Sequence, residues 1–299
     1  MNTSEKQPQG DNLSELDVVT NSHPQLTPAH PLELNWNYHL GPEPFYRADV
    51  HYALQLSIVR YGEIEIAYEN YRRICHSGDM WWTFCWEPHA YRALARRNFI
   101  ITFTINLDDL GEIGLLGSSF NWLVPFSATP DKRYCPHNQA ERNYIQQWGT
   151  RILHIYRLHP ASWQAQCWLN FHSLLLYVIE HLPEVTGIQE NASDVRIYLE
   201  RLRPALELVR TSPVTPDLHT AASVCHLSVS RFSELFRKAL GHSYGHFALR
   251  AKLGHCASDL KNGRLLLKEI AQRHGFSDAA GLCKAFRRVY HCTPQEFRA

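Results

Sequence analysis

The chain has 299 residues, a formal net charge of +1 and 44% hydrophobic residues, a composition typical of a globular protein large enough for two domains. Its eight cysteines include no Cys-x-x-Cys pair and no dense framework, so we interpret them as reduced thiols of a cytoplasmic protein. The first 30 residues hold no apolar core typical of a signal peptide, and the most apolar later run, residues 168–179, is too short to cross a membrane.

The N-terminal half begins with a tail and continues with strand-like segments. Residues 1–30 are polar, with scattered Pro, Gly, Ser and Asn, and are predicted to be disordered. Residues 54–58, 64–68 and 99–105 then alternate apolar and polar side chains with a period of two, and turn residues separate these segments. This pattern predicts an antiparallel sandwich or barrel.

Two helices are expected after these strands, over residues 143–158 and 163–181. The second is apolar on nearly every side, which is more apolar surface than packing on one barrel face requires. Both a dimer seam and ordinary core packing explain the surplus. We expect residues 31–182 to form this first domain and residues 183–195 to be the linker that follows it.

Residues 80–89 are unusually rich in tryptophan. Because alternate residues of a barrel strand face inward, five residues are candidates for a small-ligand pocket: Trp82, Trp86, Glu87, His89 and, from an earlier strand, His51. Flat aromatic walls with a few polar groups suit a sugar or an aromatic compound. The alternative is that these tryptophans fill a small barrel core.

The C-terminal third differs from the rest in charge. Residues 196–299 hold 17 Lys+Arg against 8 Asp+Glu, a net +9, whereas residues 1–195 hold 13 against 21, a net −8. A basic domain beside an acidic one indicates a polyanionic partner such as nucleic acid, although a solvated basic face gives the same count.

The basic region also repeats itself. Ala222 and Ala271 are 49 residues apart, as are Ser228 and Ser277, and one extra residue enters the second copy before Phe286. Each copy has the pattern of a short helix, a tight turn, a capping serine and a second amphipathic helix, which is a helix-turn-helix unit. Residues 243–261 between the copies predict a helix roughly 28 Å long. That length approaches the ~34 Å of one DNA turn, so the two second helices would lie in successive major grooves.

Residues 196–299 resemble the DNA-binding domain of AraC/XylS-type bacterial transcription regulators. The resemblance rests on Ile270-Ala271, Gly275-Phe276-Ser277, Phe286-Arg287-Arg288 and the segment from Thr293 to Arg298, with a weaker first copy upstream. It implies an α+β protein: an N-terminal cupin-like antiparallel β-barrel with dimerisation helices, and an all-α domain of two helix-turn-helix units joined by a long helix. It also implies a homodimeric activator that binds double-stranded DNA, a small-molecule effector and RNA polymerase.

By position, the resemblance places residues of both second helices against DNA. In the first unit these are Ser230, Arg231, Ser233, Glu234 and Arg237; in the second they are Ala279, Ala280, Gly281, Cys283, Lys284 and Arg287. His226 replaces the usual turn glycine of the first unit. Small residues begin the second recognition helix, and they make no bidentate base contacts. We therefore expect the first unit to read sequence and the second to hold phosphate.

Enzymatic patterns are weaker. The Gly-x-Ser-x-Gly match at residues 241–245 follows a predicted helix instead of a strand, so it is interpreted as a helix end and a new cap rather than a nucleophile elbow. The 18 histidines include no His-x-His pair, and we predict no metal, no cofactor, no catalytic residue and no membrane contact. The alternative interpretation is a cupin-type enzyme that carries a DNA-binding appendage.

Overall fold

The structure is a computed structural model, and it describes residues 16–19, 26, 32–43, 46–111, 121–182 and 192–298. Most of the predicted tail and residues 183–191 of the predicted linker lie outside these ranges. Residues 16–19 differ from the expected disorder, because they form strand β1 and pair with β3.

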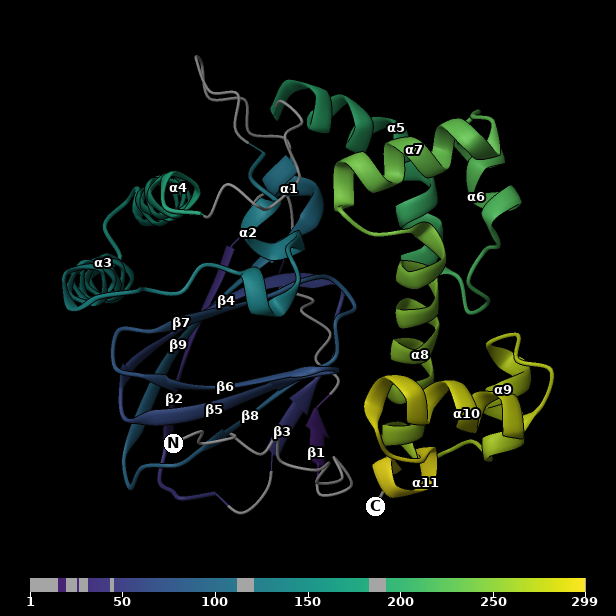
Figure 1. The fold of residues 1–299 in the computed structure, drawn as a ribbon, viewed down its shortest axis with the longest axis horizontal. Coiled ribbons are helices and arrows are strands. Elements are labelled where there is room, and N and C mark those ends of the chain that lie inside the picture. Colours follow the sequence, from purple (N-terminus) through teal and green to yellow (C-terminus); the bar gives the residue numbers. More distant parts are fainter. Residues whose placement is uncertain are drawn as a thin grey trace, which may run out of the picture.

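Two sheets make up the N-terminal half (Figure 1). The first has the order β1 (Leu16–Val19), β3 (Tyr46–Asp49), β8 (His89–Ala93), β5 (Glu63–Tyr68) and β6 (Tyr71–His76). The second has the order β2 (Leu32–His39), β9 (Asn98–Asn106), β4 (Ala53–Tyr61) and β7 (Met80–Thr83). All pairs are antiparallel except β1 with β3, so the predicted antiparallel fold is confirmed.

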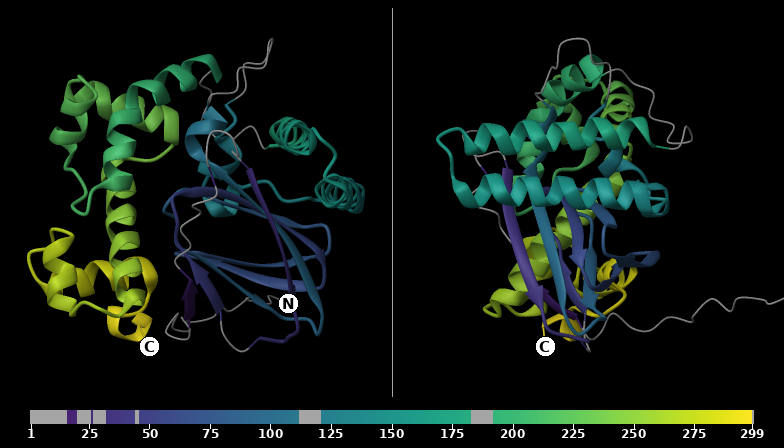
Figure 2. Two further views of the ribbon diagram at one scale, coloured as in Figure 1. Left: turned by 180° about the vertical axis from the view of Figure 1, so that it is seen from behind. Right: turned by 90° about the vertical axis from the view of Figure 1, so that its left-hand side faces the viewer.

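The period-two pattern of β9 explains how the second sheet is buried on both faces. Phe103 points outward, where its ring lies 5.1 Å from Trp148 and 6.0 Å from Phe171. These two rings belong to α3 (Gln139–Leu158) and α4 (Trp163–Glu180), which lie across that sheet (Figure 2). Short helices α1 (Leu107–Gly111), α2 (Val124–Ser127) and the 3₁₀ turn Pro130–Lys132 come between β9 and α3. The buried residues of α4 belong to the main core, which accounts for most of its apolar side chains.

The C-terminal half is entirely helical among the residues described. It consists of α5 (Ala192–Thr211), α6 (Leu218–Val224), α7 (Val229–Leu240), α8 (Tyr244–Asn262), α9 (Leu267–Arg273), α10 (Ala279–Tyr290) and α11 (Pro294–Arg298). Helix α5 starts at residue 192, inside the predicted linker. Helix α8 confirms the predicted connector, with α7 at one end and α9 to α11 at the other (Figure 1). No described helix is long and apolar enough to span a membrane.

Candidate nucleic-acid interface

The first helix-turn-helix unit is α6, a tight turn and α7. The turn places His226 at φ 54, in the left-handed region where glycine is the usual residue. Ser228 then caps α7, because its Oγ accepts a hydrogen bond of 3.2 Å from the backbone N–H of Arg231. Phe232 and Phe236 are fully buried on the inner face of α7, which fixes the opposite face toward solvent.

That outer face carries four of the five predicted DNA-facing residues as exposed side chains, namely Ser230, Arg231, Glu234 and Arg237, with Ser233 half-buried. Arg231 donates to Glu234 at 2.8 Å, and Lys238 lies 3.6 Å from the other oxygen of the same carboxylate. The hydrogen bond from Arg231 holds the pKa of Glu234 below its usual value. This pair uses one terminal nitrogen of Arg231, and the guanidinium has further N–H donors with which to contact guanine.

The second unit is α9, a turn at Gly275 with φ 69, and α10. The expected cap at Ser277 is wrong: Asp278 is the N-cap, and its carboxylate accepts from the backbone N–H of Gly281 at 2.6 Å. The extra residue of the second copy therefore lies between the turn and the cap. Ser228 corresponds to Asp278, and Arg231 to Gly281.

The outer face of α10 exposes fewer of its predicted DNA-facing residues than that of α7. Ala280, Lys284 and Arg287 are exposed, whereas Ala279, Gly281 and Cys283 are half-buried. Neither Lys284 nor Arg287 has a carboxylate within 4 Å in the described part of the chain. Arg288 is exposed as well, so α10 presents three cations behind a first turn of small residues, an arrangement suited to phosphate contacts.

Helix α8 joins the two units through contacts at both of its ends. Tyr244 packs its ring 5.3 Å from Phe236 and donates its hydroxyl to Pro216 O at 2.7 Å. Toward the other end, Lys252 donates to Gly275 O at 2.7 Å, and Asp259 lies 2.8 Å from His274 Nε2. These contacts hold both units against one helix, so the spacing of the two recognition helices is built into the domain.

The five predicted ligand residues of the barrel lie at four different places. Trp82 is fully buried on the outer face of β7, where it packs on Phe126 and donates to Tyr134 O at 2.9 Å. Trp86, at φ 57, packs against α8, where a Cβ on Gly254 would lie 2.7 Å from its ring. His51 and His89 are neighbours, with ring centroids 5.2 Å apart.

Glu87 holds a buried ionic cluster between the two halves of the chain. Its carboxylate accepts from both terminal nitrogens of Arg133 at 2.6 and 2.9 Å, and Arg250 of α8 lies 3.7 Å away. Burial, the largest single effect, would raise the pKa of Glu87, but Arg133, Arg250 and the backbone N–H of Phe84 together outweigh it, and the pKa lies below its usual value. Arg250 also contacts Glu69 at 3.2 Å. Sequence reasoning missed both arginines, because they are 46 and 163 residues from Glu87.

The barrel interior contains a polar cavity of about 230 Å³ at one end. Its wall includes Trp81 instead of Trp82, because residue 81 pairs with Ser57 on the inward face of the sheet. His89 is the one predicted ligand residue among those that line it: Asn35, Asn37, Asp49, Gln55, Ser57, Trp81, His89, Tyr91, Thr102 and Thr104. The buried Oγ1 of Thr104 has no hydrogen-bond partner among the described residues.

A possible metal-ligand set lies beside this cavity and was not expected. One ligand atom each of Asp49, His51 and His89 lies within 4.8 Å of the others. His89 contacts Glu87 O through Nδ1 at 2.9 Å, a contact that leaves Nε2 facing Gln55 at 3.1 Å. His51 fits a metal less well, because its Nδ1 accepts from the N–H of Ala53 and its Nε2 would therefore carry the proton.

Comparisons with known proteins agree with the helical half. Residues 221–299 match the family described as helix-turn-helix domain. The Msm operon regulatory protein of Streptococcus mutans is 26% identical over 192 residues, which cover 62% of this chain and 66% of that protein. The regulatory protein PocR of Salmonella typhimurium is 33% identical over 123 residues, or 40% of each chain. The chain thus spans less than two thirds of either relative.

The whole fold also has a solved counterpart. ToxT from Vibrio cholerae O395 superimposes with a TM-score of 0.52 at 10% identity, over 90% of this chain and 97% of that one. A likeness at this identity concerns the fold, and it includes both the β-sheets and the helices. The duplicated units and their caps agree with the matched segment: residues 221–299 form a helix-turn-helix domain of the AraC type.

Proposed function

We propose that the chain is a sequence-specific, DNA-binding transcription regulator of the cytoplasm. The observation that carries this proposal is the pair of capped recognition helices, α7 and α10, mounted on one connecting helix with their cationic faces in solvent. A connector of roughly 28 Å suits two successive major grooves. The regulatory names of the similar proteins support the same function.

The proposed control element is a small molecule bound in the N-terminal barrel. The polar cavity beside Trp81 and Tyr91 combines two aromatic rings with amide and hydroxyl groups, a set suited to a sugar or another polar ring compound. The similar fold ToxT has been solved with (E)-4-(8-methylnaphthalen-1-yl)but-3-enoic acid, which supports a ligand-responsive regulator. Of the residues chosen from the sequence, His89 is the one we retain for direct contact.

Dimerisation and contact with RNA polymerase complete the proposal. Helices α3 and α4 lie on the side of the barrel away from the DNA-binding half (Figure 1). We propose that they pair two copies, so that effector binding changes which DNA half-sites the dimer occupies. Activation then requires RNA polymerase to be contacted from the DNA-bound dimer.

A salt titration tests the DNA-binding claim. The logarithm of affinity for duplex DNA is expected to fall linearly with the logarithm of salt, with a slope of about −0.9 per phosphate neutralised. The double variant Lys284→Ala/Arg287→Ala is expected to make this slope about two units shallower. Arg96→Ala, an exposed arginine on the barrel, is the matched control and should leave the slope unchanged. A flat salt response of the unaltered chain would contradict the proposal.

A cupin-type enzyme with a DNA-binding appendage remains the second candidate because of the Asp49, His51 and His89 group. Elemental analysis of the purified chain separates the two functions. A stoichiometric transition metal that is lost in His89→Ala would favour the enzyme. The regulator proposal predicts no bound metal and unchanged DNA affinity after treatment with a chelator.

A further inference from the structure

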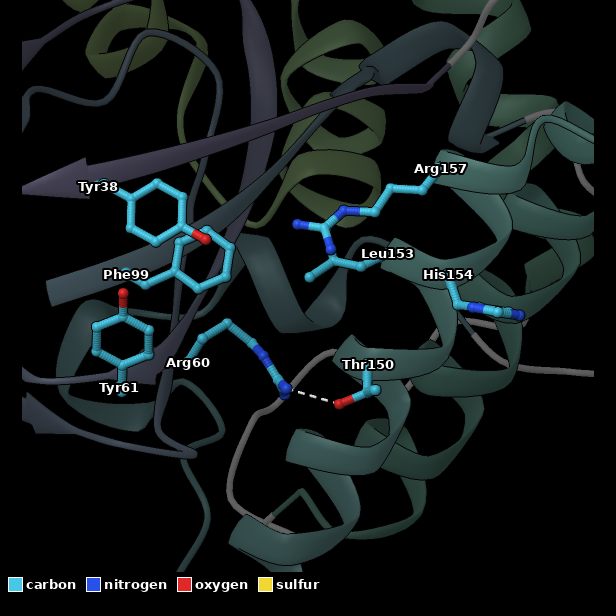
Figure 3. A pocket seen from close by; sticks show the side chains of 8 residues that line it. All are labelled: Tyr38, Arg60, Tyr61, Phe99, Thr150, Leu153, His154 and Arg157. Carbon is cyan, nitrogen blue, oxygen red and sulfur yellow. Dashed lines mark hydrogen bonds between the residues drawn. The ribbon is translucent and has the colours of Figure 1, made fainter.

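A second cavity lies outside the barrel, at the seam between the second sheet and α3. It encloses about 370 Å³, a volume in the range of small-ligand sites. The sheet supplies Tyr38, Arg60, Tyr61 and Phe99, and the C-terminal half of α3 supplies Thr150, Leu153, His154 and Arg157 (Figure 3). None of these residues belongs to the DNA-binding face or to the barrel interior.

The sheet side of this cavity is an aromatic wall. Phe99 pairs with Tyr38 on one neighbouring strand and with Tyr61 on the other, so the three rings form a row across the sheet. Tyr38 and Phe99 are stacked with centroids 4.3 Å apart, and Tyr61 lies 5.6 Å from Phe99. Tyr38 is 60% exposed. Folding therefore leaves the Tyr38 and Tyr61 rings, which are tilted by 50° to each other, partly uncovered on the cavity side.

The lining carries two guanidinium groups and no carboxylate. Arg60 is already committed to α3: it donates to Gln146 O and, at 2.6 Å, to Thr150 Oγ1. Arg157 is exposed and makes no hydrogen bond or ion pair with any residue that the structure describes. Figure 3 shows its guanidinium reaching from α3 toward the aromatic wall. One fixed and one available cation give the cavity a positive potential.

We propose that this cavity binds a small organic monoanion with a planar apolar body, and specifically an aromatic carboxylate. The ring would stack on Tyr38 with Tyr61 tilted against its edge, and the carboxylate would pair with the Arg157 fork, whose donors match two carboxylate oxygens. A phosphate dianion fits less well. Both terminal nitrogens of Arg60 already donate to α3, and α3 presents its C-terminal end here, where the helix dipole costs a dianion more than a monoanion.

Such a ligand would bridge the barrel and α3. Arg60 already crosses α3 at Gly149, where an added Cβ would lie 3.2 Å from the guanidinium. The bound anion would add a second link about two turns further along the helix, through Arg157. The proposal does not rest on the DNA-binding function, because ligand binding is measured on the full chain without DNA.

Isothermal titration calorimetry with indole-3-acetate is the direct test. The full chain is expected to bind one probe molecule, and Arg157→Leu is expected to weaken binding by about tenfold or more, because hydrogen bonds to charged groups are lost. Arg151→Leu, an exposed arginine on the same helix but outside the cavity, is the control and should bind normally. The neutral analogue indole-3-ethanol has no carboxylate. Its affinity for the unaltered chain should therefore be no higher than the affinity of indole-3-acetate for Arg157→Leu.

Three outcomes would overturn the proposal. The first is no binding by the unaltered chain, and the second is equal affinity for the neutral analogue or for Arg157→Leu. The third is a dimer that becomes monomeric in Tyr38→Ala during sedimentation, which would assign the aromatic wall to contact between two copies. Each variant is also unfolded thermally. A midpoint equal to that of the unaltered chain shows that the variant is folded, so that its loss of binding is a local effect.

Discussion

The two recognition helices, α7 and α10, have the same length of 12 residues and the same kind of N-cap, yet they present different chemistry to solvent. Helix α7 begins with Ser230 and Arg231 and continues with Glu234. The corresponding residues of α10 are Ala280, Gly281 and Lys284. The buried faces keep a phenylalanine at the same place, Phe236 and Phe286. The buried faces therefore give both units the same frame, whereas the outer faces differ in the way that the proposed division into base reading and phosphate holding requires.

The largest expected effect concerns the shared frame. Phe236→Ala and Phe286→Ala each remove a fully buried ring and are expected to lower the free energy of unfolding of their own unit by about 3–5 kcal/mol. Urea unfolding followed by circular dichroism measures this loss. A cost below about 1 kcal/mol in either unit would show that the two frames are not equivalent.

The next effect separates base reading from phosphate holding. Arg231→Ala is expected to weaken binding to the preferred DNA by about 1–3 kcal/mol and to relax specificity at one base pair. Lys284→Ala is expected to weaken binding to all sequences alike. Fluorescence anisotropy with the preferred duplex and a scrambled one distinguishes the two results. Equal relaxation of specificity by both variants would remove the proposed division of labour.

The caps give a smaller and more symmetrical effect. Ser228→Ala and Asp278→Ala each remove an acceptor of a first-turn N–H, and each is expected to cost about 1 kcal/mol of stability. Ser277→Ala is the matched control and should change stability by less than about 0.5 kcal/mol, in line with an ordinary surface substitution. A loss of about 1 kcal/mol of stability in Ser277→Ala would show instead that Ser277 caps α10, as first expected from the sequence.

The turns give the smallest effect, and its sign differs between the units. His226 and Gly275 both have positive φ, which costs a side chain about 1–2 kcal/mol. His226→Gly is expected to stabilise its unit by about 0.5 kcal/mol, since the greater freedom of unfolded glycine offsets part of the relief. Gly275→Ala is expected to destabilise its unit, because the new Cβ would lie 3.1 Å from Val214 Cγ1. Thermal denaturation of both variants measures the two signs.

Local patterns were enough to predict most of the helical half. The bounds of α7 and α8 were predicted almost to the residue. This prediction came from the period of the apolar residues, from the capping residue Ser243 and from the glycine after α7. The cap of α10 could not be placed in this way. Ser277 and Asp278 are both good caps, and the choice depends on where the inserted residue of the turn fits. That choice is a matter of packing between α9 and α10, which sequence spacing does not specify.

The barrel shows the limit of strand periodicity. An alternating pattern says that Trp81 and Trp82 face opposite sides, but it does not say which side is the interior. Which side is the interior depends on the tertiary fold, in which α2 to α4 cover the face of the sheet that holds Trp82. Likewise, Glu87 was chosen as a ligand residue on chemical grounds, whereas Arg133 and Arg250 occupy its carboxylate. Contacts between residues so distant in sequence depend on the tertiary fold.

The most direct test of the account is selection of binding sites from random duplex DNA by the full chain. We predict an enriched site with two contacted segments about one helical turn apart, with strong base preference in the segment assigned to α7 and weak preference in the one assigned to α10. Repeating the selection with Arg231→Ala assigns the segments. Strong preference only in the α10 segment, or no enriched sequence, would contradict the account.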